Sequence, residues 1–247
     1  MESEKRVLIL TYHYAPEPTS GALRVTYLAK YLRRFGWEPI VVTRKAPPGF
    51  AKDDGKVLRT GRAFQARIDP PPALAHVARF SPVAWLKQCV RQIVFFPDRA
   101  AWWIPFAVAG GLRAHRRWGY DAIVTSAMPA SVHVAGAILA RLLNAPWIAD
   151  YRDLWNGNPY VEDSPPRAKL LLQLERAAIR RASALTTITS SLASALATLH
   201  DRPVRTIANA SDAGEWESVP FEPPDRFRIV HAGTLYDGLR NPEPVIA

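Results

Sequence analysis

Residues 150–155, with the sequence DYRDLW, hold the most informative group of chemically active side chains. Two carboxylates and a guanidinium, on Asp150, Arg152 and Asp153, follow an apolar run that is typical of a buried strand. Charges at the end of a buried strand are costly unless they are paired or solvated in a cleft. Asp150 or Asp153 could therefore accept a proton from a substrate hydroxyl, and Arg152 could hold an anionic substrate. A structural cluster in which these side chains pair only with one another is an equally good interpretation.

Two other loops offer groups that could bind a ligand. Gly21, at a predicted helix start, lets the backbone approach a phosphate closely, and Arg24 adds a positive charge beside it. Ser126 ends a predicted strand, and His133 falls early in the next helix. A lone glycine there is more often part of a cap, and a lone histidine on an apolar helix is more often structural. The roles that we assign are catalysis for Ser126, Asp150 and Asp153, and substrate binding for Gly21, Arg24, His133 and Arg152.

Familiar motifs of other enzyme classes are missing from the sequence. The first strand-to-helix loop has no G-x-G-x-x-G, and no G-x-x-x-x-G-K-[ST] or G-x-S-x-G occurs anywhere. These absences weigh against a nicotinamide or flavin enzyme, a P-loop nucleotidase and an ordinary α/β-hydrolase. The six histidines and the single cysteine show no zinc-ligand spacing, so we expect no metal site.

The elements that must position these residues alternate between strands and helices. Predicted strands cover residues 7–12, 39–43, 121–125, 146–149, 184–189 and 204–207, and predicted helices cover about 21–35, 130–143, 167–181 and 191–199. This alternation is typical of a doubly wound, mostly parallel, Rossmann-like α/β sheet with right-handed crossovers. In such a sheet ligands bind beyond the carboxyl ends of the strands, which is where the three loops lie.

The first predicted helix, capped by Thr19 or Ser20, has a stripe of large apolar side chains at helical spacing: Leu23, Tyr27, Leu28, Tyr31, Leu32 and Phe35. We expect this stripe to pack on the sheet and Arg24 to reach solvent. Residues 46–112 fit the alternation less well, with short strands predicted at 57–60 and 64–68. Residues 73–96 have apolar side chains at helical spacing among basic ones, which favours either a helix in a membrane interface or one packed on the sheet.

The net charge of +10 is concentrated in one half of the 247-residue chain. Residues 1–125 hold 20 Lys and Arg against 9 Asp and Glu, a net +11, whereas residues 126–247 hold 12 against 13, a net −1. A basic half favours an anionic partner such as a lipid surface or a phosphorylated substrate. Nucleic acid ranks last, because the interleaved aromatic and basic residues form a helical pattern rather than an open stacking platform. The sequence shows no signal-peptide layout and no convincing spanning segment, so we expect a soluble or surface-bound protein.

The C-terminal part of the sequence changes character at residue 212. Residues 212–225 have the proline-rich composition of a linker, and residues 227–233 form a predicted strand. One strand cannot bury a core of its own, so we divide the chain into a first domain at 1–211, a linker at 212–225 and the opening of a second domain at 226–247. The alternative is that the last strand joins the edge of the first sheet.

Several segments together resemble the N-terminal half of a family 4 glycosyltransferase, a retaining enzyme with two Rossmann-like lobes. The matching segments are residues 7–18 and 21–24, 96–98 and 102–103, 146–155, 185–191, 207–212 and 229–236. The proline-rich first loop and DYRDLW are the more specific of these, and they are similar to enzymes that build bacterial surface polysaccharides. Ser126 stands where the family has a histidine, so the resemblance assigns no base.

The resemblance implies that the first lobe binds a glycan or lipid-linked acceptor and that a nucleotide sugar is the co-substrate, with no other cofactor. Gly233 and Arg240 would then contact the donor phosphates. Most of the family's donor-binding lobe lies beyond residue 247, so we expect little transfer by this chain alone, which would be a shortened protein or a subunit that needs a separate C-terminal half. We expect it in the cytoplasm, bound peripherally to the inner face of the plasma membrane. A basic α/β module that only docks on anionic membrane or a partner protein is the alternative, and a nicotinamide-dependent enzyme is a third.

Overall fold

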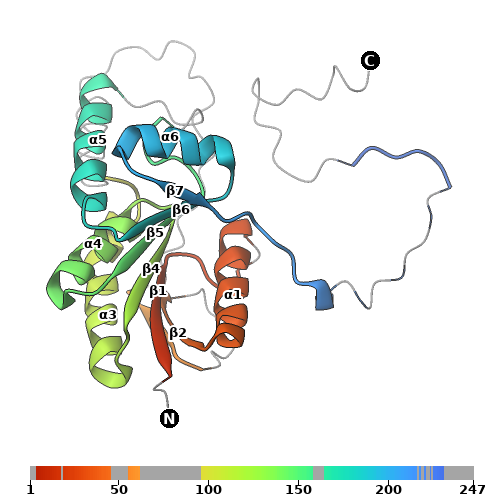
Figure 1. The fold of residues 1–247 in the computed structure, drawn as a ribbon, viewed down its shortest axis with the longest axis horizontal. Helices are drawn as coiled ribbons and strands as arrows, with labels where there is room; N and C mark the ends of the chain where they lie inside the picture. Colours follow the sequence, from red (N-terminus) through yellow and green to blue (C-terminus); the bar gives the residue numbers. More distant parts are fainter. Residues whose placement is uncertain are drawn as a thin grey trace, which may run out of the picture. The chain divides into compact units, whose positions relative to one another are not determined.

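The computed structural model describes residues 4–17, 19–45, 55–61, 96–157, 164–215, 217, 220, 223 and 225–230. The chain divides into two compact units, Met1–Ser211 and Asp212–Ala247. Figure 1 shows the first unit as a sheet with helices packed against it. The two units are described separately below.

The first unit is built on one parallel sheet whose strand order is β3-β2-β1-β4-β5-β6-β7. The strands are β1 (Lys5–Thr11), β2 (Trp37–Arg44), β3 (Val57–Thr60), β4 (Ala122–Ala127), β5 (Trp147–Tyr151), β6 (Ala184–Thr187) and β7 (Val204–Thr206). The order reverses between β1 and β4, the point at which doubly wound sheets open a ligand-binding crevice. The predicted Rossmann-like α/β fold is confirmed.

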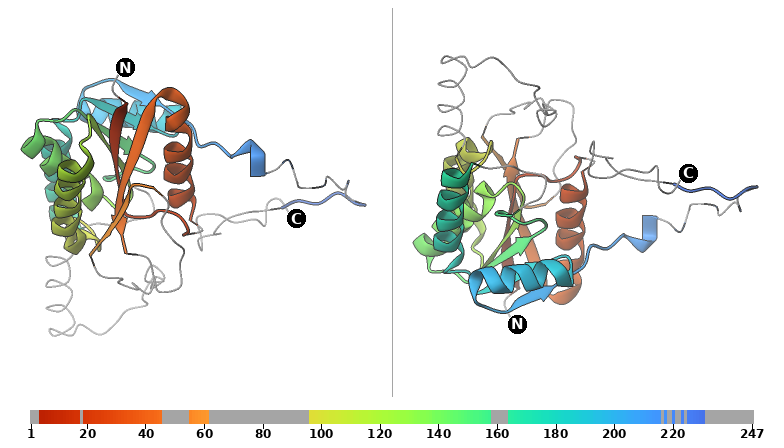
Figure 2. Two further views of the ribbon diagram at one scale, coloured as in Figure 1. Left: turned by 90° about the horizontal axis from the view of Figure 1, so that it is seen from below. Right: turned by 90° about the horizontal axis from the view of Figure 1, so that it is seen from above.

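Helices cover both faces of this sheet. They are α1 (Ser20–Leu32), α3 (Ile104–Trp118), α4 (Ser131–Leu143), α5 (Pro165–Ile179) and α6 (Ser190–His200), with short 3-10 turns at Arg33–Phe35 and Ala101–Trp103. The second unit contains a 3-10 turn at Ala213–Glu215. In Figures 1 and 2, α1 lies on one face of the sheet, and α3 and α4 lie side by side on the other. In the described parts of the chain, no helix has the length and apolar character needed to cross a bilayer.

Alternating side chains along the central strands fill a separate cluster on each face. Leu8 and Leu10 of β1 point into the larger cluster, which also contains Trp103 and Trp147. Ile9, between the two leucines, points into the smaller cluster. This two-sided burial explains why the central strands are continuous apolar runs.

The face that α1 buries differs from the prediction. The buried residues are Gly21, Ala22, Val25 and Ala29, whereas Leu23 is 46% exposed and Phe35 is 78% exposed. Small side chains let the helix lie close to Ile9, and the larger apolar side chains then flank the contact or reach solvent. Arg24 was expected in solvent, but its side chain is only 10% exposed.

Three further predictions need revision. The helix α3 was missed, and β5 extends to Tyr151, so that Asp150 lies in the strand and not after it. Residues 227–230 form no strand and are exposed. The rest of that segment, together with the predicted elements at 64–68 and most of 73–96, lies outside the described residues. The assignment of the second unit to a donor-binding domain stays a prediction.

Candidate functional site

Three polar side chains lie in register at the carboxyl ends of neighbouring strands. Asp150 of β5 is paired with Ser126 of β4 on one side and with Thr186 of β6 on the other. All three are buried, and they lie on the face of the sheet that α1 covers, since Arg24 of α1 reaches them. The row places a buried carboxylate at the edge where ligands of α/β sheets bind.

The Asp150 carboxylate is fully occupied by hydrogen-bond donors. Arg24 makes a two-pronged ion pair, with Nη2 2.8 Å from Oδ1 and Nε 3.0 Å from Oδ2. Thr186 Oγ1 donates to Oδ1 at 2.8 Å, and Ser126 Oγ donates to Oδ2 at 3.0 Å. Each carboxylate oxygen therefore accepts two hydrogen bonds, which leaves little capacity for a further donor.

The same contacts set the charge state of Asp150. Burial is the largest influence and by itself would raise the pKa of the carboxyl group. The hydrogen bonds and charge of Arg24, with smaller contributions from Thr186 and Ser126, outweigh burial, so that the pKa of Asp150 lies below its usual value. The group is therefore an anion at neutral pH and a weak proton acceptor.

Arg24 also holds the segment that follows β7. Its Nη1 donates to Ala208 O at 3.2 Å and to Asn209 Oδ1 at 3.1 Å. One guanidinium thus links α1, β5 and the chain that leaves β7, which are far apart in the sequence. This linkage explains why Arg24 is withdrawn from solvent.

Arg152 forms the other cationic wall of the cluster. Its Nε donates to Ala127 O at 2.7 Å and its Nη2 donates to Met128 O at 2.6 Å, so the guanidinium is fixed against the end of β4. Gly21 is packed against it, because a Cβ atom on Gly21 would lie 1.7 Å from Arg152 Nη1. Burial lowers the pKa of Arg152, whereas the charges of Asp150 and Asp153 raise it.

The structure thus brings together five of the predicted site residues, namely Gly21, Arg24, Ser126, Asp150 and Arg152. Asp153 is exposed, and it acts on Arg152 through its charge. Gly233 and Arg240 lie outside the described residues, so their predicted contact with donor phosphates stays a prediction. Two arginines, one of them paired with the buried Asp150, place fixed guanidiniums at this part of the edge, and guanidiniums suit an anionic ligand.

His133 is placed elsewhere. Its side chain is completely buried, and its Nδ1 lies 2.8 Å from the hydroxyl of Thr125, which points to the face of β4 opposite Ser126. Trp147 Nε1 donates to the same hydroxyl at 2.8 Å. Burial, the largest influence, lowers the pKa of His133 to about 3, so the ring is neutral. This placement favours the structural interpretation of His133 over substrate binding.

Several polar residues near the site were not predicted. Thr186 and Asn209 bind Asp150 and Arg24; both lie in segments that resemble the family, 185–191 and 207–212, but neither was assigned a role. His13 Nδ1 lies 2.7 Å from Glu17 Oε2 in the loop after β1, and Arg44 binds the other oxygen of Glu17 at 2.7 Å. The proline-rich character of this loop was noticed in the sequence, but its titratable pair was not.

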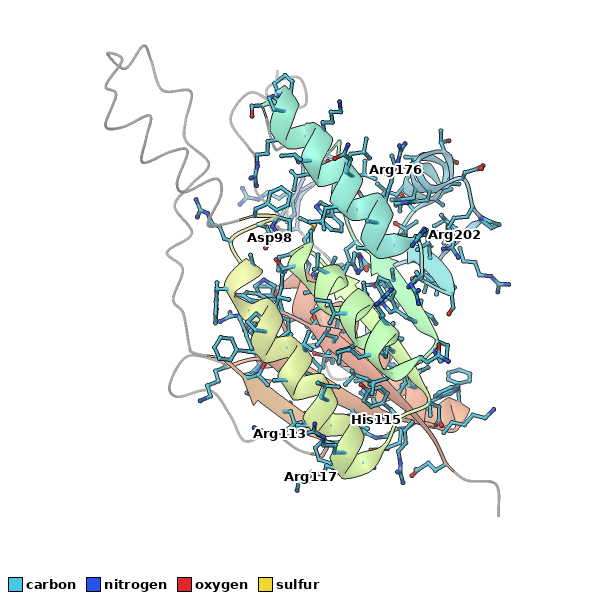
Figure 3. All side chains as sticks on the ribbon, turned by 90° about the vertical axis from the view of Figure 1, so that its left-hand side faces the viewer. Asp98, Arg113, His115, Arg117, Arg176 and Arg202 are labelled. Carbon is cyan, nitrogen blue, oxygen red and sulfur yellow. The ribbon has the colours of Figure 1, made fainter. Side chains whose placement is uncertain are left out.

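A half-buried aspartate also fixes the start of α4. Asp98 accepts hydrogen bonds from the Ser131 backbone N–H at 2.8 Å and from its hydroxyl at 2.7 Å. Figure 3 labels Asp98 near the ends of α3 and α4. Because the N-terminus of α4 is tied down in this way, the loop between β4 and α4, which supplies Met128 O to Arg152 next to Ala127 O at the end of β4, is held in place.

Comparison with known proteins gives one family and several similar folds. Residues 21–210 match the model of a family described as "Glycosyl transferase 4-like domain". Sucrose-phosphate synthase from Thermosynechococcus elongatus is similar in structure, with a TM-score of 0.57 and 18% identity over 84% of this chain and 49% of that one. A shorter chain of that synthase gives a TM-score of 0.51 and 16% identity, over 84% of this chain and 91% of that one.

The catalytic domain of starch synthase IV from Arabidopsis thaliana is also similar, with a TM-score of 0.50 and 13% identity over 86% of this chain and 52% of that one. At such identities the likeness is one of fold. The chain spans about half the length of the full synthase and of the starch synthase domain. No curated protein matches the sequence.

Proposed function

The chain belongs to the glycosyl transferase 4-like family, and we propose that residues 1–211 form the acceptor-binding lobe of a glycosyltransferase. The enzyme would transfer a sugar from a nucleotide-sugar donor to a glycan or lipid-linked acceptor in the synthesis of a cell-surface polysaccharide. The observation that carries this proposal is the pair of fixed guanidiniums, on Arg24 and Arg152, at the carboxyl edge of the sheet. The Arg152 guanidinium suits a phosphate or carboxylate group of an acceptor, and Arg24, which already makes four hydrogen bonds, adds its positive charge beside it.

The geometry gives the residues of the site different tasks. Asp150 is saturated with donors and has a lowered pKa, so it would orient Arg24 and not remove a proton from the acceptor. Arg152 and the start of α1 at Gly21 would contact the acceptor. Asp153 is exposed, which leaves it free to accept a proton from a hydroxyl. The oxygens of Asp150 already accept four hydrogen bonds and have little capacity to bind a metal ion. This suits a reaction that uses a nucleotide sugar as co-substrate and no metal ion.

The donor's diphosphate would be held by a second lobe, which the described residues do not contain. We therefore expect residues 1–211 to bind an acceptor but not to transfer a sugar by themselves. The structural match supports this separation of acceptor binding from donor binding, because this chain covers only 49% of the sucrose-phosphate synthase chain.

The basic first half would bring this lobe to the inner face of the plasma membrane. Each Lys or Arg near an anionic bilayer contributes about 1 kcal/mol of attraction. Co-sedimentation with phosphatidylglycerol vesicles over a salt series would measure this association. Binding that does not weaken with added salt would contradict a charge-driven association.

The main test is acceptor binding by the purified full chain. Calorimetric titration with a short-chain polyprenyl diphosphate sugar should give saturable binding that is about tenfold weaker in Arg24→Gln and Arg152→Gln, since the first loses a positive charge beside the acceptor and the second loses a charged contact with it. Arg33→Gln is the matched control, because its side chain is 51% exposed and lies at the far end of α1. Equal affinity in all four proteins, or rapid transfer from a nucleotide sugar by this chain alone, would overturn the proposal.

A further inference from the structure

A cavity of about 270 Å³ opens between α3 and the edge of the sheet formed by β2 and β3. The described residues that line it are Lys45, Arg59, Thr60 and Gly61 from the ends of the two strands, and Phe106, Ala109, Gly110 and Arg113 from α3. Figure 2 shows α3 and α1 on opposite faces of the sheet. The cavity is lined by α3, whereas the Asp150 cluster is bound by Arg24 of α1, so the two are separate. Its volume is near the lower end of the range for small-ligand sites, which is about 300–1,000 Å³.

The floor of the cavity is closely packed. A Cβ atom on Gly110 would lie 2.7 Å from Thr60 Cγ2 and 2.9 Å from Val42 Cγ1, so α3 approaches the strands where it has no side chain. Trp103 Nε1 donates to Thr60 Oγ1 at 3.1 Å, which fixes the end of β3 against the start of α3. These contacts fix the floor of the cavity, whereas Lys45, Phe106 and Arg113 at its rim are exposed.

The lining is cationic. Lys45, Arg59 and Arg113 contribute three positive charges, and none of the described lining residues is acidic. Arg59 is held in position, because its Nη2 donates to Ala15 O at 2.7 Å. Figure 3 labels Arg113 on α3, and neither Arg113 nor Lys45 forms an ion pair with any described residue. Lys45 and Arg113 are exposed at the rim, and their charges, beside the fixed guanidinium of Arg59, favour an anion at the cavity.

We propose that this cavity binds a phosphate-bearing group, either a phosphate monoester or a diphosphate. Guanidinium groups match phosphate oxygens in pairs, and a lysine ammonium adds a compact charge beside them. Phe106, which is 44% exposed, and Ala109 provide an apolar wall for the part of the ligand next to the phosphate. The proposal does not depend on acceptor binding at the Asp150 cluster.

Pyrophosphate is the first probe, titrated calorimetrically into the full chain at low salt. Saturable binding should weaken about tenfold in Lys45→Gln and in Arg113→Gln, because each variant loses one charged contact. Ala109→Phe should also weaken binding, because it narrows the cavity without changing its charge. Arg116→Gln is the matched control: it is exposed on the same helix, does not line the cavity, and should bind like the wild type.

A second arm separates a lipid phosphate from a soluble one. Vesicles of phosphatidylcholine with and without phosphatidic acid would be sedimented with the same variants. A larger loss of vesicle binding in Arg113→Gln than in Arg116→Gln supports a lipid phosphate, and a difference seen only with pyrophosphate supports a soluble phosphate ester.

No saturable binding of either probe, or equal losses in Arg113→Gln and Arg116→Gln, would overturn the proposal. Arg24→Gln distinguishes it from the proposed acceptor site, because that variant should leave the pyrophosphate affinity of the cavity unchanged.

Discussion

The contact between Gly21 and Arg152 leads to a prediction about stability that can be worked out from the structure. In Gly21→Ala the new Cβ atom would lie 1.7 Å from Arg152 Nη1 and 2.7 Å from Cζ. Restoring ordinary van der Waals contact requires the guanidinium to move by roughly 2 Å. The hydrogen bonds of 2.7 Å to Ala127 O and 2.6 Å to Met128 O cannot survive a shift of that size.

The cost follows from the two lost bonds. A hydrogen bond that involves a charged group contributes about 1.5–3 kcal/mol to stability, which gives about 3–6 kcal/mol for the pair. Two effects reduce that cost: the displaced guanidinium regains water, and alanine is up to about 1 kcal/mol better than glycine in a helix. We therefore expect Gly21→Ala to lower the free energy of unfolding by about 2–4 kcal/mol, against a usual total of about 5–15 kcal/mol.

A double-mutant cycle tests whether Arg152 is the cause. In an Arg152→Ala background the obstruction is gone, so Gly21→Ala should be neutral or stabilising, and the coupling energy should be about 3 kcal/mol. Urea unfolding, followed by tryptophan fluorescence and circular dichroism, would measure all four proteins, with the exposed neighbour Ser20→Ala as the control. A coupling energy below about 0.5 kcal/mol would show that the guanidinium has room to move and that our account of this contact is incorrect.

Two other predictions concern buried ionisable groups. The pKa of His133 is about 3 in the folded chain against about 6.5 when unfolded, so the unfolded state binds the proton first as the pH falls, and stability should drop by about 2 kcal/mol from pH 7 to pH 5. Urea unfolding at several pH values should show that loss in the wild type and not in His133→Asn; parallel pH profiles would contradict it. Asp150→Asn removes the charge that faces Arg24 and should cost about 3–5 kcal/mol, whereas Arg33→Gln, at a largely exposed ion pair, should cost less than about 1 kcal/mol. Similar losses of unfolding free energy in both variants would argue against a special role for the buried pair.

The sequence was sufficient to predict the class of fold and most of its strands. Runs such as residues 7–12 and 39–43 are apolar because both of their faces are buried, and that pattern is local. The helix α3 was missed because Pro105, Gly110 and Gly111 are poor helix formers. In the structure these glycines allow close packing, Gly110 on Thr60 and Gly111 on Leu139. Contacts between residues so far apart in the sequence cannot be recognised from the residues of one short segment.

The site was predictable in its residues but not in its pairings. DYRDLW, Gly21 and Arg24 were identified from residue type and position, yet the sequence offered no means of joining Arg24 to Asp150 across 126 positions. The apolar stripe of α1 was misassigned for a related reason. How closely a helix approaches a sheet depends on its small residues, here Gly21, Ala22, Val25 and Ala29, whereas the prediction followed the large ones.

The contacts of Asp150 also determine which experiments can inform on function. Because its oxygens bind α1, β4, β5 and β6 together through Arg24, Ser126 and Thr186, substitution of Asp150 must disturb the fold before it disturbs any reaction. Loss of activity in Asp150→Asn would therefore not identify a catalytic base. Asp153 lies three positions further along, is exposed and makes no hydrogen bond to Arg24, so Asp153→Asn should leave the free energy of unfolding nearly unchanged. If transfer by an assembly that contains this lobe depends on Asp153 while folding does not, the result supports Asp153 as the proton acceptor and Asp150 as a positioning residue.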